Sequence, residues 1–310
     1  MKKIYIYLCG GLGNQLFEYA AAKNLALKND ARLIIDTKTG FITDFRDSTK
    51  FSLKKNTLKN VKFMGFNLFF FLFRILKKFI SKKKLKYEFL NSIFIDESNH
   101  DNFDDRINNI KFNNNLYLLG YFQSQKYFKE YENEILEDLV PQKPITDSYL
   151  QMKDKISQEN SISIGIRMHE NIDREFGFKI NKKRKKKMIE GIGGITPISF
   201  YLKSIDYFIN KIKNPEFFLF STKNSNIKEL INQSDILKSY PTTIITGDND
   251  FQDAYDNLWL MSQCKNFIIS NSTLYWWAAY FSKKKYKKNE VICSSNFPNK
   301  STYLEEWKKI

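Results

Sequence analysis

The stretch that most constrains the fold is residues 251–281, FQDAYDNLWLMSQCKNFIISNSTLYWWAAYF. Ala254, Leu258 and Met261 recur at helical spacing, and the apolar run NFIIS that follows is typical of a strand buried on both faces. The next segment, LYWWAAYF, is apolar nearly all round, as in a helix that is itself buried. The stretch therefore predicts a helix, a strand and a second helix in immediate succession, which is a unit of a parallel α/β sheet.

Asn271, Ser272 and Thr273 stand between this strand and the second helix. Their side chains are of the types that cap helix starts, and the first backbone N–H groups of a helix favour an anion. This turn therefore predicts a binding site of the size of a phosphate. The three residues also form a glycosylation sequon, but nothing else in the sequence indicates secretion.

The second half of the chain repeats the same alternation of strand and helix. Apolar runs of strand length, such as SISIGIR and EFFLFS, alternate with segments of helical periodicity. This pattern is typical of a doubly wound α/β domain with a parallel sheet. The predicted strands are 161–167, 216–221, 242–246, 266–270 and 290–293, and the predicted helices are 197–213, 225–233, 252–263 and 273–281.

The first residues predict a strand, a glycine-rich turn and a helix. Residues 3–9 form an apolar run, residues 15–29 have helical periodicity and residues 32–36 form a second run, which together make a βαβ unit. The turn, GGLGNQ, has glycines that let the backbone approach a ligand at a helix start that favours an anion. It is not a dinucleotide fingerprint, because Gln15 and Leu16 stand where the third glycine would be.

Pro141 and Pro144 mark the predicted domain boundary. They follow an apolar strand at 116–122 and a predicted helix from Ser124 to about residue 139, which a proline would end. An N-terminal domain of residues 1–143 and a C-terminal domain of residues 144–310 are each long enough to bury a core. Residues 37–115 have no clear pattern and form a variable region of the first domain.

One segment of that variable region, FNLFFFLFRILKKFI, has the periodicity of an amphipathic helix and is followed by a lysine-rich tail. Asn67, Arg74, Lys78 and Ser81 share one face, with phenylalanines and leucines opposite. Two interpretations are open. The helix lies in the core of the first domain, or Phe66–Lys86 makes peripheral contact with the inner face of the cytoplasmic membrane, with its cations at anionic lipid.

The composition of the chain limits its expected binding partners and its cellular compartment. The 50 Lys and Arg residues against 34 Asp and Glu give a net charge of +16, which suits nucleic acid, anionic lipid or an anionic substrate. Cys9, Cys264 and Cys293 lie far apart in apolar runs, as buried thiols do in a reducing compartment. The first apolar run is too short for a signal peptide, and no stretch has the about 20 apolar residues of a spanning helix. We therefore expect a cytoplasmic protein.

Three motifs resemble those of one enzyme family. LMSQCKNFIISNSTLYWWAA, within the stretch described first, resembles the pattern LMS.CKH.IIANSTFSWWGA. GGLGNQLFEYA resembles GGLGNQ[ML]FQYA, and GYFQSQKYF resembles GYWQSEKYF. These patterns are those of the α-1,2-fucosyltransferases, glycosyltransferase family 11. The resemblance spans the chain and leaves residues 37–115 unmatched.

This resemblance implies a fold and a reaction. The fold is α/β and GT-B-like, with two Rossmann-like doubly wound domains facing a cleft, the first on the acceptor side and the second binding the nucleotide sugar. The reaction is an inverting transfer of L-fucose from GDP-fucose to an oligosaccharide or lipid-linked glycan in an α-1,2 linkage, in bacterial O-antigen, LPS or capsule synthesis. Gly11, Gly13, Asn14 and Gln15 would line the cleft near donor or acceptor, although Gly13 could equally serve the turn alone.

The chemistry of such a transfer singles out Arg167. Without a metal, a departing diphosphate needs cations and helix N-termini. Arg167 ends the predicted strand SISIGIR, and a doubly wound sheet binds its ligands at the carboxyl ends of its strands. Arg167 would therefore hold the diphosphate together with Asn271, Ser272 and Thr273.

The residues around Arg167 depart from the family pattern VAIHIRRGDY. Gly165 replaces the histidine, Met168 the second arginine, His169 the glycine and Glu170 the aspartate. Loss of the second arginine removes one bidentate grip on phosphate. His169 and Glu170, with Asp173, are the nearest candidates for the base that takes the proton of the acceptor hydroxyl.

The residues predict no metal site, because the chain has 2 histidines and because Asp248-Asn249-Asp250, which has nearly the Asp-x-Asp form, sits at a predicted helix start where Asp250 is better explained as an N-cap. We expect metal-independent turnover. Two alternatives stay open. The donor is another GDP-sugar, or the chain is a basic peripheral protein that binds lipid or nucleic acid through Phe66–Lys86 and residues 181–187. The interleaved aromatic strands of RNA-binding domains are absent, so nucleic acid is not an expected partner.

Overall fold

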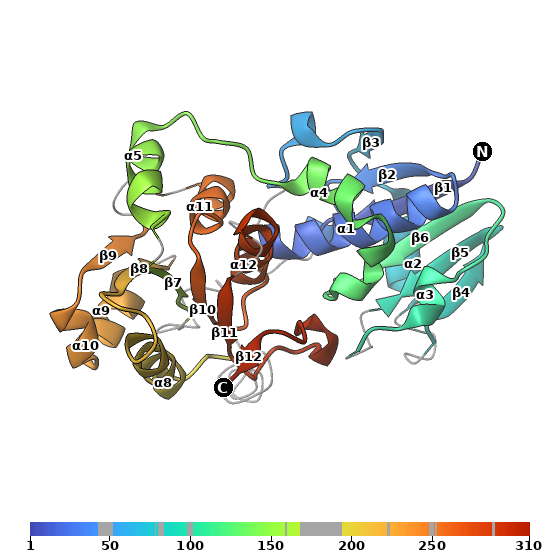
Figure 1. Cartoon of the computed structure of the whole chain (residues 1–310). Coiled ribbons are helices and arrows are strands. Elements are labelled where there is room, and N and C mark those ends of the chain that lie inside the picture. Colours follow the sequence, from blue (N-terminus) through green and yellow to red (C-terminus); the bar gives the residue numbers. More distant parts are fainter. Residues whose placement is uncertain are drawn as a thin grey trace. The chain divides into compact units, whose positions relative to one another are not determined.

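The computed structural model describes residues 1–42, 52–77, 79, 84–97, 102–158, 160–167, 194–221, 224–247, 251, 253–286 and 289–310. The chain forms two compact units (Figure 1). Unit 1 contains Met1–Val140 and Asn299–Leu304, and unit 2 contains Pro141–Pro298 and Glu305–Ile310. A short segment near the C-terminus therefore belongs to the unit that the N-terminal residues build.

Unit 1 contains a six-stranded sheet. Its strands are β1 (Lys3–Tyr7), β2 (Arg32–Asp36), β3 (Val61–Met64), β4 (Lys86–Phe89), β5 (Ser92–Asp96) and β6 (Asn115–Leu119). Its helices are α1 (Leu12–Lys28), α2 (Leu68–Leu76), α3 (Asp105–Asn108) and α4 (Glu132–Leu139), with short turns η1 (Thr39–Phe41), η2 (Lys55–Thr57), η4 (Gln125–Tyr127), η5 (Lys129–Tyr131) and η7 (Lys300–Thr302). The strand order is β3-β2-β1-β6-β5-β4, and every neighbouring pair is parallel except the hairpin of β4 and β5. The predicted N-terminal βαβ unit is confirmed.

Helices α1 and α2 cover opposite faces of this sheet. Helix α1 is buried almost throughout, from Leu12 to Ala26, and packs on β1. On the other face, the rings of Tyr5, Tyr117, Phe94 and Phe73 stack in a row with neighbouring centroids 4.5, 4.5 and 4.3 Å apart. Because Phe73 comes from α2 and the other rings from β1, β6 and β5, aromatic stacking fixes one side of α2 to the sheet.

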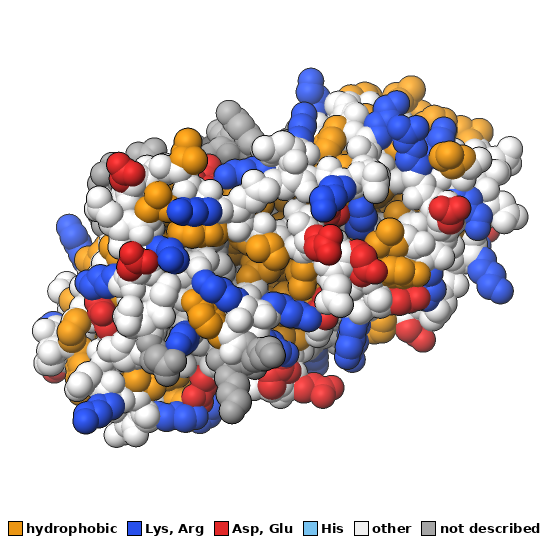
Figure 2. All heavy atoms as spheres, turned by 45° about the horizontal axis from the view of Figure 1, so that its top comes forward, with side chains coloured by type: hydrophobic (Ala, Val, Ile, Leu, Met, Phe, Trp, Pro, Cys, Tyr) orange, Lys and Arg blue, Asp and Glu red, His pale blue; other side chains and the backbone are white. Residues whose placement is uncertain are grey.

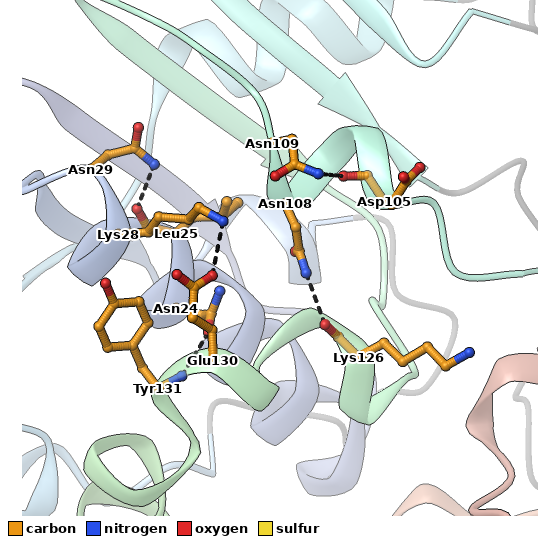
Figure 3. A network of polar contacts seen from close by, with 10 residues as sticks. All are labelled: Asn24, Leu25, Lys28, Asn29, Asp105, Asn108, Asn109, Lys126, Glu130 and Tyr131. Atoms are coloured by element: carbon orange, nitrogen blue, oxygen red, sulfur yellow. Dashed lines mark hydrogen bonds and ion pairs between the residues drawn. The ribbon is translucent and has the colours of Figure 1, made fainter.

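Polar contacts at the surface of unit 1 fasten its helices to the turns before α4 (Figure 3). Lys28, at the end of α1, lies 2.9 Å from the carboxylate of Glu130, and Asn24 accepts a hydrogen bond of 3.2 Å from the N–H of Tyr131. Asn108 of α3 donates to a backbone carbonyl of η4 at 2.8 Å. Exposed ion pairs contribute little on their own, so the buried side of α1 supplies most of the attachment.

Unit 2 contains a second six-stranded sheet, in which all pairs are parallel. Its strands are β7 (Ser161–Gly165), β8 (Glu216–Phe220), β9 (Thr242–Ile245), β10 (Asn266–Ile269), β11 (Glu290–Cys293) and β12 (Lys308–Lys309). Its helices are α5 (Asp147–Ile156), α8 (Ile198–Ile209), α9 (Asn224–Asn232), α10 (Asp235–Ser239), α11 (Ala254–Met261) and α12 (Thr273–Tyr286). The order is β12-β11-β10-β7-β8-β9, so the chain builds outward from β7 and then outward from β10 in the opposite direction.

Both faces of the second sheet are covered by helices (Figure 1). Ile162, Ile164 and Ile268 point to the face on which α8, α9 and α10 pack. The alternate residues of β7 point to the other face, where Ser161 contacts Cys264 and Gly165 contacts α12. The predicted α/β fold with two doubly wound sheets is confirmed.

The second half of the chain was well predicted and the first half less so. The structure places the strands and helices expected from residue 161 onward within a few residues of their predicted bounds, and adds α10 and β12. The helix predicted from Ser124 to about residue 139 is wrong in its first half, which consists of η4 and η5, because Ser124 caps a short turn by accepting the N–H of Lys126. Strands β3, β4 and β5 were not predicted.

Basic and acidic side chains are mixed on one face of the molecule (Figure 2). On the face drawn in Figure 2, Lys and Arg side chains are spread over the surface with Asp and Glu between them. Burial raises the pKa of Cys264 and of Cys293 to about 12, so both thiols are neutral core residues. Among the described helices, none is long and apolar enough to cross a membrane.

Candidate functional site

The strand order of unit 2 makes the edge between β7 and β10 a candidate binding site. The chain moves away from these two neighbouring strands in opposite directions, and such a switch point leaves room for a ligand at the carboxyl ends of the strands. Arg167 follows β7 and Asn271 follows β10, so both predicted residues lie at this edge. Nη1 of Arg167 donates to the backbone carbonyl of Asn271 at 2.9 Å and reaches its side-chain Oδ1 at 3.4 Å.

Two buried tyrosines that the sequence analysis missed hold the backbone next to this guanidinium. The hydroxyl of Tyr201, from α8, accepts the N–H of Arg167 at 3.0 Å. The hydroxyl of Tyr275, from α12, reaches the carbonyls of Ile166 and Phe220, each at 3.1 Å. Tyr275 therefore bridges the ends of β7 and β8 one residue before Arg167. A tyrosine on an apolar helix face needs a partner for its hydroxyl, and that need was the signal available in the sequence.

Burial also sets the ionisation of these tyrosines. It raises the pKa of Tyr201 to about 12, although the hydrogen bond to Arg167 and the hydroxyls of Ser270 and Thr196 offset part of the rise. Burial likewise raises the pKa of Tyr275. Both phenols are therefore neutral at physiological pH and act as hydrogen-bonding groups rather than as bases.

Gly165, the last residue of β7, is glycine because of Tyr275. A Cβ on Gly165 would lie 2.4 Å from two carbons of the Tyr275 ring, closer than any real contact of that kind. The ring occupies the space that a side chain of β7 would fill. The departure of Gly165 from the histidine of the family pattern thus has a steric cause.

Asn271 joins segments that are distant in the sequence. Its Nδ2 donates to the carbonyl of Gly194 at 2.7 Å and reaches the carbonyl of Asn296 at 3.5 Å. Nδ2 of Asn296 in turn contacts the carbonyl of Ile195 at 3.2 Å. Asn271 is buried, and this network together with Arg167 fixes its position.

Ser272 and Thr273 lie at the start of α12 and are partly exposed. The N–H of Ser272 donates to the carbonyl of Ser270 at 2.7 Å, which turns the chain from β10 into the helix. Helix α12 is 14 residues long and begins beside Arg167. The positive end of its dipole and the guanidinium therefore lie at the same edge of the sheet. This edge suits an anion.

The predicted glycine turn of unit 1 lies between β1 and α1. Gly10 has a φ of +70°, and Gly11 precedes the first residue of the helix. Gln15 is buried and structural, since its amide donates to the carbonyl of Gly10 at 3.0 Å and accepts the N–H of Ser52 at 2.9 Å. Asn14 accepts from Gln123 at 3.0 Å. A Cβ on Gly11 would meet nothing within 4 Å, and Gly11 therefore borders open space, whereas Gly13 is buried.

Buried carboxylates near the same end of the first sheet were also missed by the sequence analysis. Glu18, on α1, accepts the N–H and the thiol of Cys9, each at 3.0 Å, and burial raises its pKa well above the usual range. Glu97, directly after β5, accepts the N–H groups of Tyr121 and Phe122 at 3.2 and 3.3 Å. Burial raises the pKa of Glu97 to about 8.

A family model decides the identity of the chain. Residues 2–310 match the model described as Glycosyl transferase family 11. The chain belongs to glycosyltransferase family 11.

Two relatives of this glycosyltransferase come from Escherichia coli. One, an α-1,2-colitosyltransferase, is 26% identical over 284 residues, with 90% of this chain and 88% of the relative covered. The other, the O-antigen biosynthesis glycosyltransferase WbnK, is 25% identical over 300 residues, with 90% of each covered. Among solved structures, fucosyltransferase NodZ from Bradyrhizobium is similar with a TM-score of 0.44 and 11% identity, over 90% of this chain and 93% of that one.

Several residues proposed for this glycosyltransferase from its sequence lie outside the described residues. They are Met168, His169, Glu170 and Asp173, which lie within six residues after Arg167. Within the described residues, no group of three or more His, Cys, Asp and Glu side chains is arranged to hold a metal ion. The structure thus brings together Arg167 and Asn271 in unit 2, and Gly11, Asn14 and Gln15 in unit 1.

Proposed function

We propose that this family 11 enzyme transfers L-fucose from GDP-fucose to a glycan hydroxyl, forming an α-1,2 linkage in the synthesis of O-antigen or another bacterial surface polysaccharide. The observation that carries the proposal is the contact of Arg167 with the carbonyl of Asn271, 2.9 Å long, at the start of α12. Arginine and a helix N-terminus together suit the diphosphate of a nucleotide sugar. The named activities of the two Escherichia coli relatives support a glycan product.

In the proposed reaction, the oxygen of the acceptor hydroxyl attacks the anomeric carbon of the donor, and the bond between that carbon and the diphosphate oxygen breaks. The configuration at the carbon inverts. Arg167 and the first N–H groups of α12 stabilise the negative charge that develops on the departing GDP, so no metal is required for this role. The hydroxyl proton passes to a base, for which we propose Glu170 or His169.

The sugar of the donor is the least constrained part of the proposal. Met168 stands in place of the second arginine of the family pattern, and a single guanidinium grips phosphate less firmly than two. One relative is a colitosyltransferase, which favours a colitosyl donor as the second candidate. Both candidates use the same acceptor chemistry and differ only in the sugar that is transferred.

Thermal unfolding with nucleotides tests the donor. GDP and GDP-fucose should each raise the melting temperature in the presence of a metal chelator, and a ligand at about 100 times its dissociation constant stabilises the folded state by roughly 2.7 kcal/mol. Incubation with GDP-fucose and with a colitosyl donor, followed by linkage analysis of the product, separates the two sugars. A shift with UDP-sugars and none with GDP would overturn the donor assignment.

A further inference from the structure

Helix α2 carries apolar side chains on its outer face. Leu68, Leu72 and Ile75 are 55%, 38% and 40% exposed, and they recur at the spacing of a single helical stripe. Phe79, beyond the end of the helix, is 84% exposed. We call the exposed apolar residues of this region the α2 stripe: Phe66, Leu68, Phe69, Leu72, Ile75 and Phe79.

The polar side chains of the same helix make hydrogen bonds and an ion pair inside unit 1. Asn67 is buried and accepts the first N–H groups of the helix at 2.9 and 3.3 Å. Arg74 donates to the carbonyl of Thr39 at 2.7 Å, and Lys77 pairs with the buried carboxylate of Asp96. The face of Asn67 and Arg74, predicted to lie opposite the phenylalanines, therefore points inward together with Phe70 and Phe73. One side of the helix therefore belongs to the core of unit 1, and the other side is exposed and apolar.

An exposed apolar stripe of this kind is unfavourable in water. Burying a leucine, isoleucine or phenylalanine side chain is worth roughly 1.5–3 kcal/mol, and the stripe leaves much of that gain unused. Scattered apolar residues on a surface need no explanation, but a contiguous patch marks an interaction site. We therefore expect another surface to cover the α2 stripe.

The charge of the surrounding sequence selects the partner. From Asn67 to Tyr87 the sequence contains no Asp or Glu, and it contains Arg74 and lysines at 77, 78, 82, 83, 84 and 86, of which Arg74 and Lys77 are bound inside unit 1. Lys84 and Lys86 are exposed and line, with Phe73, Leu76 and Glu88, a hollow of about 220 Å³ beside α2, in which Lys86 pairs with Glu88 at 2.8 Å. An apolar stripe beside a cluster of lysines is the combination that binds anionic lipid.

We propose that the α2 stripe inserts into the surface of an anionic lipid bilayer, with Lys84 and Lys86 at the headgroups. A second copy of the chain fits the stripe less well, because a two-fold interface would bring the same lysines face to face. This membrane contact involves α2 and the two lysines beside it, and it does not depend on the sugar donor. For an enzyme acting on lipid-linked glycans, it supplies a way of reaching the acceptor.

Vesicle sedimentation tests the proposal with the full chain. Phosphatidylglycerol vesicles should pull down the protein at low salt, high salt should release part of it, and phosphatidylcholine vesicles should bind it weakly. Leu68→Ser with Leu72→Ser should lower the partition coefficient by about tenfold or more, since each leucine loses its burial in the lipid. Lys84→Gln should lower it about fivefold on anionic vesicles only.

The matched control is Ile145→Ser, which removes a side chain that is 96% exposed and lies in unit 2. It should sediment as the unmodified chain does, and the melting temperature of each variant shows that the fold is intact. Three outcomes would overturn the proposal. The folded protein stays in the supernatant under all conditions, the stripe variants bind as tightly as the control, or size exclusion shows a dimer that the stripe variants dissociate while vesicles bind nothing.

Discussion

The ring of Tyr275 lies against Gly165 so closely that a Cβ added to the glycine would be 2.4 Å from the ring. In the family pattern, the position of Gly165 holds histidine and that of Tyr275 holds serine. A smaller residue on the strand is thus accompanied by a larger one on the helix. Because the Tyr275 hydroxyl also holds the carbonyl of Ile166, this packing fixes the backbone that leads to Arg167.

Gly165→Ala should destabilise the protein by about 1–3 kcal/mol, because the core beside β7 has no room for the methyl group. Urea unfolding measures the loss. Tyr275→Ser opens a cavity and is destabilising by itself, yet it should reduce the effect of Gly165→Ala when the two are combined. Independent, additive effects would show that the ring does not occupy the space beside Gly165.

Arg167→Ala should lower kcat by about two to three orders of magnitude, which is the usual effect of removing one donor that stabilises transition-state charge. Arg167→Lys should recover little, because an ammonium does not reproduce the planar guanidinium fork. Transfer rates and GDP affinity by calorimetry measure both. The control is Arg106→Ala, an exposed arginine paired with Asp104 two residues away. Near-normal rates in both Arg167 variants would place the diphosphate elsewhere.

The glycine turn offers a matched pair of substitutions. Gly10→Ala should destabilise unit 1 by roughly 1–2 kcal/mol, since its φ is +70° and a Cβ would lie 2.6 Å from Nδ2 of Asn14. Gly11→Ala should leave the melting temperature unchanged, because nothing lies within 4 Å of the added methyl group. If a substrate lies against the turn, Gly11→Ala should raise KM. Unchanged KM for both donor and acceptor would remove Gly11 from the proposed site.

Glu97 should make stability depend on pH. Below the ordinary carboxyl pKa of 4.5 the group is protonated in both folded and unfolded chains. Between 4.5 and about 8 only the unfolded chain loses the proton, so stability should fall as pH rises, by up to about 1.4 kcal/mol per pH unit. Glu97→Gln should reduce the dependence of the unfolding free energy on pH. Glu18, whose pKa is also raised by burial, should account for the dependence that remains. Equal slopes in urea midpoints for both proteins would show that Glu97 ionises normally when folded.

Most elements of unit 2 could be predicted because β7, β8, β10 and β11 are apolar runs between turn residues and are almost wholly buried, whereas β12 consists of two exposed lysines and was missed. Strand β4 could not, since it is an edge strand whose Lys86 and Glu88 are exposed and pair with each other at 2.8 Å. The orientation of α2 could not be predicted either. Sequence periodicity shows that two faces differ, but the inward position of Arg74 depends on the carbonyl of Thr39, which only the folded chain brings near.

The candidate site was predicted in part, because two of its residues stand at the ends of apolar strands. Arg167 and Asn271 each end an apolar strand, and strand ends of a parallel sheet meet at one edge, so their proximity follows from the pattern. Tyr201 and Tyr275 lie within apolar helices, and although their hydroxyls require partners, the sequence does not show which groups those partners are. Their role rests on hydroxyl contacts with backbone groups 34 and 109 residues away in the sequence.

The return of Asn299–Leu304 to unit 1 sets an order of events during biosynthesis. Ser301 accepts from Ser124 at 2.8 Å through its carbonyl, and Thr302 donates to the carbonyl of Gln123 at 2.7 Å. These partners are synthesised before Pro141–Pro298, and at about 5–20 residues per second roughly ten to thirty seconds pass before the missing contacts are made. The unit that is begun first thus waits for residues made near the end of the chain, and a truncated N-terminal fragment would expose the surface that these residues cover.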